Sequence, residues 1–116
     1  MPNDSQREGG VSKVMAGFLK VAKAGDVSPG KGMMVEVNGK KIALFNVEGS
    51  FYAIDDTCTH RGGPLSQGVL EEKQVRCPWH GALFDVTNGE VVGPPAPSAV
   101  TRYNVRVEGA DIEVEV

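Results

Sequence analysis

The sequence predicts an all-β fold, and three features support this prediction. Turn-forming pairs such as Asn38-Gly39 and Asn88-Gly89 recur along the 116-residue chain. The segments between the turns are short, and several alternate apolar with polar residues, as strands with one buried face do. Almost no segment has the helical spacing of apolar residues. Together these features predict an antiparallel β barrel or sandwich that carries two long loops.

The N-terminal half is predicted to contain a meander. Residues 14–22 are expected to form the first strand, and residues 31–37 and 41–47 flank Asn38-Gly39. Both residues of this pair tolerate positive φ, which favours a tight hairpin turn. A second turn that contains glycine leads into residues 51–54. Three neighbouring strands are therefore expected to be joined by short turns.

The middle of the chain is predicted to hold two loops between short hairpins. Residues 55–68 lose all periodicity and are rich in glycine, serine, threonine and proline, which is typical of a loop. A second loop is expected at residues 78–82. The short strands around these loops are expected at residues 69–70, 74–77, 83–86 and 90–92.

The C-terminal part is predicted to form two more strands. Residues 93–98 are rich in proline and cannot lie inside a strand, because proline donates no ladder hydrogen bond. In residues 101–107, Tyr103, Val105 and Val107 alternate with polar residues, so one face of this strand is expected to be buried. The last strand is expected at residues 112–116.

Length, charge and hydropathy limit the class of protein. A chain of 116 residues is long enough for one core and too short for two ordinary domains, so we expect a single domain at residues 14–116. The polar and charged N-terminus predicts a disordered leader at residues 1–13. A net charge of −3 argues against nucleic acid or an anionic membrane as partner. The apolar runs are too short to cross a bilayer. The polar N-terminus does not resemble a signal peptide, so the protein is expected to be cytoplasmic.

All cysteine and histidine residues of the chain fall into two short pairs. Cys58-Thr59-His60 and Cys77-Pro78-Trp79-His80 each lie on a predicted loop, and residues 61–76 separate them. Two thiolates and two imidazoles in such pairs are typical of a metal site. No further histidine remains to act as a general base, so no catalytic residue is expected.

The residues alone leave four interpretations of these pairs. Chance would place two cysteines in the core and two histidines on the surface. A Cys58–Cys77 disulfide would leave both histidines unexplained, and a reducing compartment disfavours it. Structural zinc suits two thiolates and two imidazoles, but zinc fingers with these ligands usually place both cysteines before both histidines. A [2Fe–2S] cluster with mixed ligands is the fourth interpretation.

The two pairs resemble the Rieske motif, Cys-x-His followed by Cys-Pro-x-His-Gly, and residues 93–96 resemble the proline loop that covers the cluster in that family. The resemblance implies the Rieske fold, with a small cluster-binding subdomain of two loops at about residues 56–98. It also implies one [2Fe–2S] cluster per chain. The expected ligands are Cys58 and Cys77 on the inner iron and His60 and His80 on the outer iron.

The residues next to the motif resemble those of low-potential members. High-potential members carry an extra cysteine in each loop, and the two form a disulfide, whereas this chain has Gly63 and Trp79 near those places. High-potential members also carry a serine and a tyrosine whose hydroxyls hydrogen-bond the cluster or its ligand sulfur. This chain has Ala82 and Phe84 instead. The missing donors imply a low reduction potential.

The resemblance therefore implies a soluble one-electron carrier that is not itself an enzyme. An oxygenase α subunit would need a second iron site with two further histidines, which the chain lacks. We expect a free ferredoxin that accepts an electron from a flavin-dependent reductase and passes it to a terminal oxygenase. The alternative is the small subunit of an assimilatory nitrite reductase, bound to its large subunit. A non-redox domain with structural zinc is the third interpretation.

Overall fold

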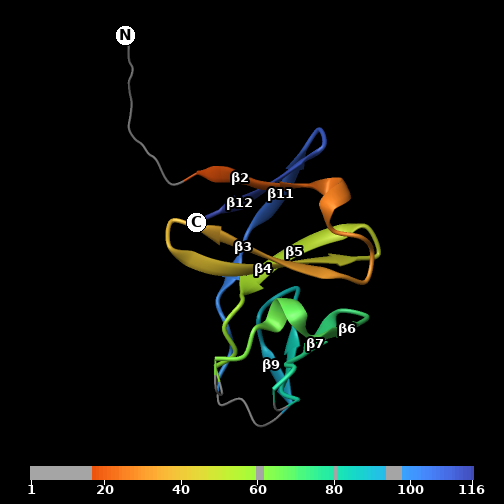
Figure 1. The fold of residues 1–116 in the computed structure, drawn as a ribbon, viewed down its shortest axis with the longest axis vertical. Helices are drawn as coiled ribbons and strands as arrows, with labels where there is room; N and C mark the ends of the chain where they lie inside the picture. The colour runs from red at the N-terminus through yellow and green to blue at the C-terminus, as the bar shows by residue number, and fades with distance from the viewer. Residues whose placement is uncertain (1–16, 60–61, 80, 94–97) are drawn as a thin grey trace.

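The fold is all-β, as predicted. The computed structural model describes residues 17–59, 62–79, 81–93 and 98–116, and these contain antiparallel strands and two short 3-10 turns. The strands form three sheets that follow one another along the long axis of the molecule (Figure 1). Within the described ranges, no helix is long and apolar enough to cross a membrane. The predicted leader at residues 1–13 lies outside the described ranges.

The middle sheet contains the predicted meander. Its strands are β3 (Gly32–Val37), β4 (Lys40–Val47), β5 (Ser50–Asp55) and β10 (Arg102–Tyr103), in the order β10-β5-β4-β3. Asn38 and Gly39 have φ values of 52° and 81°, so the predicted hairpin turn between β3 and β4 is confirmed. Glu48 adopts the same left-handed region, with φ at 53°, ahead of Gly49 in the next turn.

The other two sheets lie on opposite sides of the middle sheet (Figure 1). One contains β2 (Phe18–Lys23), β11 (Val105–Glu108) and β12 (Asp111–Glu115), in the order β11-β12-β2. The other contains β6 (Val69–Glu71), β7 (Gln74–Arg76), β8 (Leu83–Asp85) and β9 (Val91–Gly93), in chain order. The 3-10 turns are η1 (Ala24–Asp26) and η2 (Leu65–Gln67). The second of these turns lies inside the segment predicted to be loop only.

The strand predicted at residues 101–107 is interrupted, because the chain changes sheets at Asn104. β10 pairs with β5, whereas β11 pairs with β12. Asn104 accepts a hydrogen bond from the Glu115 backbone N–H and donates one from its side chain to the Glu115 carboxylate. The prediction that Val107 faces the interior is wrong, since its side chain is 45% exposed. Apolar and polar residues continue to alternate in the sequence after the chain has left the core, so the pattern alone could not show that Val107 is exposed.

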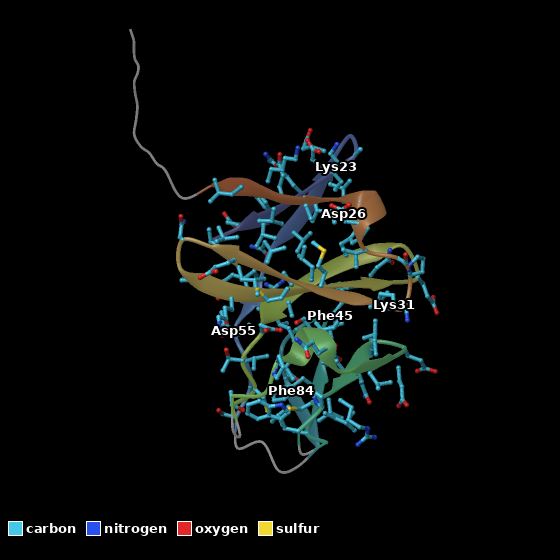
Figure 2. The ribbon with its side chains drawn as sticks, viewed as in Figure 1. Lys23, Asp26, Lys31, Phe45, Asp55 and Phe84 are labelled. Carbon is cyan, nitrogen blue, oxygen red and sulfur yellow. The ribbon has the colours of Figure 1, made fainter. Side chains whose placement is uncertain are left out.

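Two hydrophobic cores share the middle sheet. Along β4, Ile42 and Leu44 belong to the core on the β2 side, and Ala43 and Phe45 belong to the core on the β7 side. All four side chains are fully buried, so β4 contributes to both cores. Phe45, from the middle sheet, and Phe84, from the β6–β9 sheet, belong to the same core (Figure 2). This second core is the one that contains the two cysteines.

Candidate metal centre

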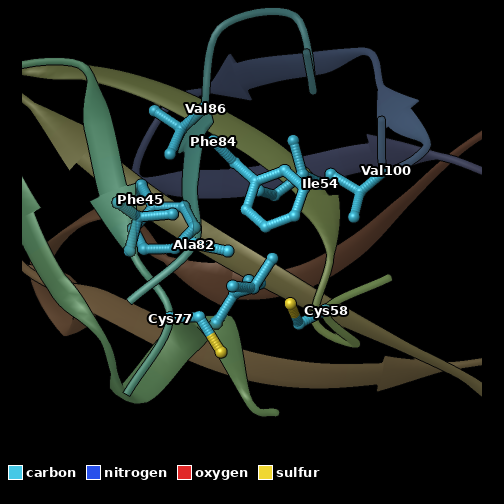
Figure 3. Close-up of a cluster of buried hydrophobic side chains, with 11 residues drawn as sticks. Phe45, Ile54, Cys58, Cys77, Ala82, Phe84, Val86 and Val100 are labelled. Carbon is cyan, nitrogen blue, oxygen red and sulfur yellow. The ribbon is translucent and has the colours of Figure 1, made fainter. Parts of the chain in front are cut away.

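The two cysteines follow strands that end at the same side of the molecule. Cys58 comes three residues after the end of β5, and Cys77 comes directly after β7. Each is only 3% exposed, and both belong to one apolar cluster with Ala82 and Phe84 (Figure 3). No disulfide joins them. The structure therefore brings both predicted cysteine ligands into one buried region, although they are far apart in the sequence.

The two cysteine loops are closed by the same pattern of backbone hydrogen bonds. The Cys58 N–H donates to the Gly63 carbonyl over 2.9 Å, and the Cys58 carbonyl accepts from the Gly62 N–H over 2.8 Å. Cys77 repeats this pattern with Ala82 at 2.8 Å and with Gly81 at 3.0 Å. Gly62 and Gly81 have φ values of 77° and 79°, a region that glycine adopts without strain. Each loop is thus a closed turn that fixes the direction of its cysteine side chain.

Two side chains reinforce these loops, and the sequence patterns did not single out either of them. The Arg76 guanidinium donates to the Gly81 carbonyl over 3.1 Å. The Thr59 hydroxyl donates over 2.6 Å to the carbonyl of Ser98, the last residue of the proline-rich segment. A hydroxyl or a guanidinium next to a predicted ligand has many ordinary uses, so only the three-dimensional structure could identify these contacts.

The predicted histidine ligands His60 and His80 lie outside the described residues, as does most of the predicted proline loop. Within the described ranges, no three cysteine, histidine or acidic side chains come together as a metal site. The ligand set of four residues therefore stays a prediction from the sequence.

The described residues fit an iron–sulfur cluster. Two thiols on separate loops lie in one apolar region, and the backbone N–H and carbonyl groups of both cysteines are hydrogen-bonded within their closed turns. An oxidised [2Fe–2S] site with two thiolates and two neutral imidazoles has no net formal charge, so an apolar environment tolerates it. A hydroxyl side chain is absent at positions 82 and 84, where Ala82 and Phe84 are fully buried.

Comparison with known protein families decides between the interpretations. The profile of the Rieske [2Fe–2S] domain matches residues 17–104. The chain belongs to the Rieske [2Fe–2S] family. It therefore carries a [2Fe–2S] cluster, as predicted, and the interpretations as a disulfide, a zinc site or a chance pairing are set aside.

Similar proteins place the chain among the ferredoxins of this family. It is 35% identical to the ferredoxin component of the naphthalene 1,2-dioxygenase/salicylate 5-hydroxylase systems of Ralstonia sp., over 85% of this chain and 95% of the relative. The ferredoxin of carbazole 1,9a-dioxygenase from Nocardioides aromaticivorans IC177 has a similar structure, with a TM-score of 0.81 and 30% identity over 84% of this chain and 96% of that one. A ferredoxin solved in complex with the oxygenase of carbazole 1,9a-dioxygenase gives a TM-score of 0.80 with 34% identity, over 84% and 92%.

The likeness to these ferredoxins covers most of both chains, so the Rieske protein described here is an electron-transfer component and not a catalytic subunit. This agrees with the prediction from the sequence. None of these relatives is a nitrite reductase subunit, and the comparisons give that alternative no support.

Proposed function

We propose that Cys58, His60, Cys77 and His80 hold the cluster, and that the chain carries single electrons from a flavin-dependent reductase to the terminal oxygenase of an aromatic-ring dioxygenase system. The single observation that carries this proposal is the burial of Cys58 and Cys77 in matching closed turns within one apolar region. The motif supplies the two histidines as the remaining ligands.

The chain's own residues have three tasks in this function. When bound, the cluster supplies a site that takes up and releases one electron. The closed turns orient the cysteine sulfurs, and the apolar side chains around Cys58 and Cys77 exclude water from the inner side of the site. Thr59 ties the first cysteine loop to the backbone carbonyl of Ser98.

The end of the molecule that carries the cysteine loops is the side on which we place partner binding. Trp79 and Val69 are 56% and 60% exposed, and an open groove of about 390 Å³ runs between Val69, Arg76 and Pro78 next to Cys77. The β2 sheet lies at the opposite end (Figure 1). Electron transfer needs a short distance between donor and acceptor, so a partner is expected to approach the cysteine end. A related ferredoxin has been seen in complex with its oxygenase, which supports a terminal oxygenase as the partner.

The first experiment tests the cluster and its ligands. The purified protein is expected to contain equal amounts of iron and acid-labile sulfide, and after reduction with dithionite to give the EPR spectrum of a Rieske centre. Cys58→Ser and Cys77→Ser are expected to lose the cluster, and His60→Cys and His80→Cys to change or lose the Rieske signal. Zinc without labile sulfide, or normal EPR spectra in the histidine variants, would contradict the proposed ligands.

The second experiment tests the partners. The reduced protein is mixed in a stopped-flow instrument with a purified terminal dioxygenase, and reoxidation is followed by visible absorption. The large subunit of an assimilatory nitrite reductase serves as the comparison. We expect faster reoxidation by the dioxygenase, and fast reduction of the oxidised protein by a flavin-dependent ferredoxin reductase with NADH. Preferential reaction with the nitrite reductase would overturn the proposed role.

A further inference from the structure

Gly63 lies closer to a predicted ligand sulfur than a residue with a side chain could. A methyl carbon built on Gly63 would lie 2.6 Å from the Cys77 Sγ and 3.2 Å from Cγ and Cδ2 of Trp79. Real Cβ atoms do not approach other heavy atoms to 2.6 Å, so the sulfur or the loop would have to move. Gly63 has no positive φ, so its backbone conformation would accept any residue. Glycine is needed at this position for space alone.

The same contact joins the two cysteine loops. Gly63 belongs to the loop of Cys58, whereas Cys77 and Trp79 belong to the other loop. The indole of Trp79 is 56% exposed, yet its Cγ and Cδ2 lie against the buried Gly63. The ring therefore covers the backbone of the opposite loop on one side and meets solvent on the other. Beneath it the Cys77 side chain is only 3% exposed.

We propose that Gly63 and Trp79 are positioning residues for the cluster. This inference rests on the proposed function, because it takes Cys77 as a ligand. Gly63 leaves the space that the Cys77 sulfur occupies, and the Trp79 indole closes that space against water. The two cysteine loops are thereby held together by a packing contact.

Gly63→Ala tests the space next to the sulfur. We expect the displaced sulfur to shift the EPR g-values of the reduced protein, and to shorten several-fold the half-life of the cluster in the presence of an iron chelator. Gly25→Ala is the matched control, because a Cβ there meets no heavy atom within 4 Å and φ is not positive. Gly109→Ala controls for backbone strain, because its φ is 63° and a Cβ there would meet no heavy atom within 4 Å, in the turn between β11 and β12. Gly109→Ala is expected to keep the wild-type g-values.

Trp79 variants test the covering ring. Reduction adds negative charge to the site, and water stabilises that charge, so exposure to solvent raises the reduction potential. Trp79→Ala is expected to raise the midpoint potential and to shorten the cluster half-life. Trp79→Phe is expected to stay close to the wild type in both, because a phenyl ring can still cover Gly63.

The outcomes separate this inference from the proposed function. Wild-type protein without iron and labile sulfide, or Cys77→Ser with an unchanged cluster, would overturn the proposed ligands. A normal wild-type cluster together with a Gly63→Ala variant that has the g-values and half-life of Gly25→Ala would overturn the role of Gly63. A midpoint and half-life unchanged in Trp79→Ala would overturn the role of Trp79.

Discussion

Ala82 and Phe84 determine the polarity of the wall next to the two cysteines. Both are fully buried and belong to the cluster that contains Cys58 and Cys77 (Figure 3). Neither side chain can donate a hydrogen bond. A donor to the cluster or its ligand sulfur would stabilise the additional negative charge of the reduced state. Its absence therefore favours the oxidised state and a low potential.

We expect the wild-type midpoint potential at neutral pH near the low end of the Rieske range, about −150 mV. Ala82→Ser combined with Phe84→Tyr is expected to raise it. A hydrogen bond that contributes about 1 kcal/mol to the reduced state corresponds to about 40 mV for one electron. Protein-film voltammetry measures both values. A wild-type midpoint clearly above zero, or a double variant with an unchanged midpoint, would contradict this explanation.

Asn46 is a buried polar residue that follows the apolar run of residues 42–45 in strand β4. Its side chain is almost fully buried, donates to the Val27 carbonyl over 2.8 Å and accepts from the Gly49 N–H over 2.7 Å. Asn46→Leu would leave both backbone groups without these bonds. We expect the free energy of unfolding to fall by about 2–3 kcal/mol, as measured by urea denaturation. Val47→Ala at the neighbouring half-buried position is the control, and an equal loss there would contradict the role of the hydrogen bonds.

At the residue scale, the sequence predicted the cysteine and histidine pairs as ligands, but it did not predict the contacts that support the cysteine loops. Cysteine and histidine are scarce in the chain and paired, so their pattern was informative. The structure shows what the pattern of residue types did not, namely that the N–H groups of Gly62 and Gly81 close the two turns by bonding to the cysteine carbonyls. The role of Gly63 depends on a distance between two loops, which no local pattern contains.

β10 is a strand of two residues, and the hydrogen bond of Tyr103 to β5 secures it. The Tyr103 hydroxyl donates to the Asp55 carboxylate over 2.6 Å. Burial, followed by this hydrogen bond, raises the pKa of Tyr103 from 10.0 to about 12. Because Asp55 is the last residue of β5, the contact lies where the chain leaves the middle sheet for the first cysteine loop.

The raised pKa of Tyr103 predicts a loss of stability in alkali. The folded state holds the phenolic proton more tightly than the unfolded state, so the stabilisation is complete below pH 10 and is lost as the pH rises towards about 12. Tyr103→Phe removes the titrating group and its hydrogen bond. It is expected to lower the free energy of unfolding by about 1 kcal/mol at neutral pH.

Denaturation at pH 8 and pH 11 checks this prediction. The difference between wild type and Tyr103→Phe should be smaller at pH 11 than at pH 8, because only the wild type loses the contribution of this proton. Tyr52→Phe, on the neighbouring strand, serves as the control for removal of a phenol. A difference that stays constant between the two pH values would show that Tyr103 does not carry the effect.

At the element scale, tight turns made most strands predictable. The Asn38-Gly39 pair identified the hairpin of β3 and β4, and their predicted and observed bounds differ by a single residue at one end of each strand. The boundary between β10 and β11 was missed, because apolar alternation runs through Asn104 without a turn signal. The segments on either side of Asn104 pair with different strands, and this pairing depends on tertiary contacts that the local sequence does not contain.

The whole molecule is organised around a sheet that is buried on both faces. Ile42 and Leu44 contribute to one core, and Ala43 and Phe45 to the other. The sequence showed a continuous apolar run at residues 42–45, but not that two further sheets cover it from opposite sides. Which sheet covers which face depends on contacts between segments that are far apart in the chain.

A shared sheet predicts one cooperative unfolding transition. Thermal unfolding followed by far-UV circular dichroism and by visible absorption of the cluster should have the same midpoint. Phe45→Ala and Leu44→Ala remove fully buried side chains from opposite cores, and each is expected to cost about 3–4 kcal/mol. Both probes should shift together in both variants. Loss of the visible signal well below the far-UV transition in Leu44→Ala would contradict this coupling.

The pairing of β5 with β10 has a consequence for the order of folding. These strands are neighbours in the middle sheet, yet the whole chain from Asp56 to Thr101 runs between them. An unstructured excursion of this length costs about 3 kcal/mol of loop-closure entropy before the two strands can meet. When residues 56–101 have already formed their own core, Asp55 and Thr101 come together at a smaller cost in loop-closure entropy. Local hairpins should therefore form first, and β10 should join its sheet late in the folding reaction.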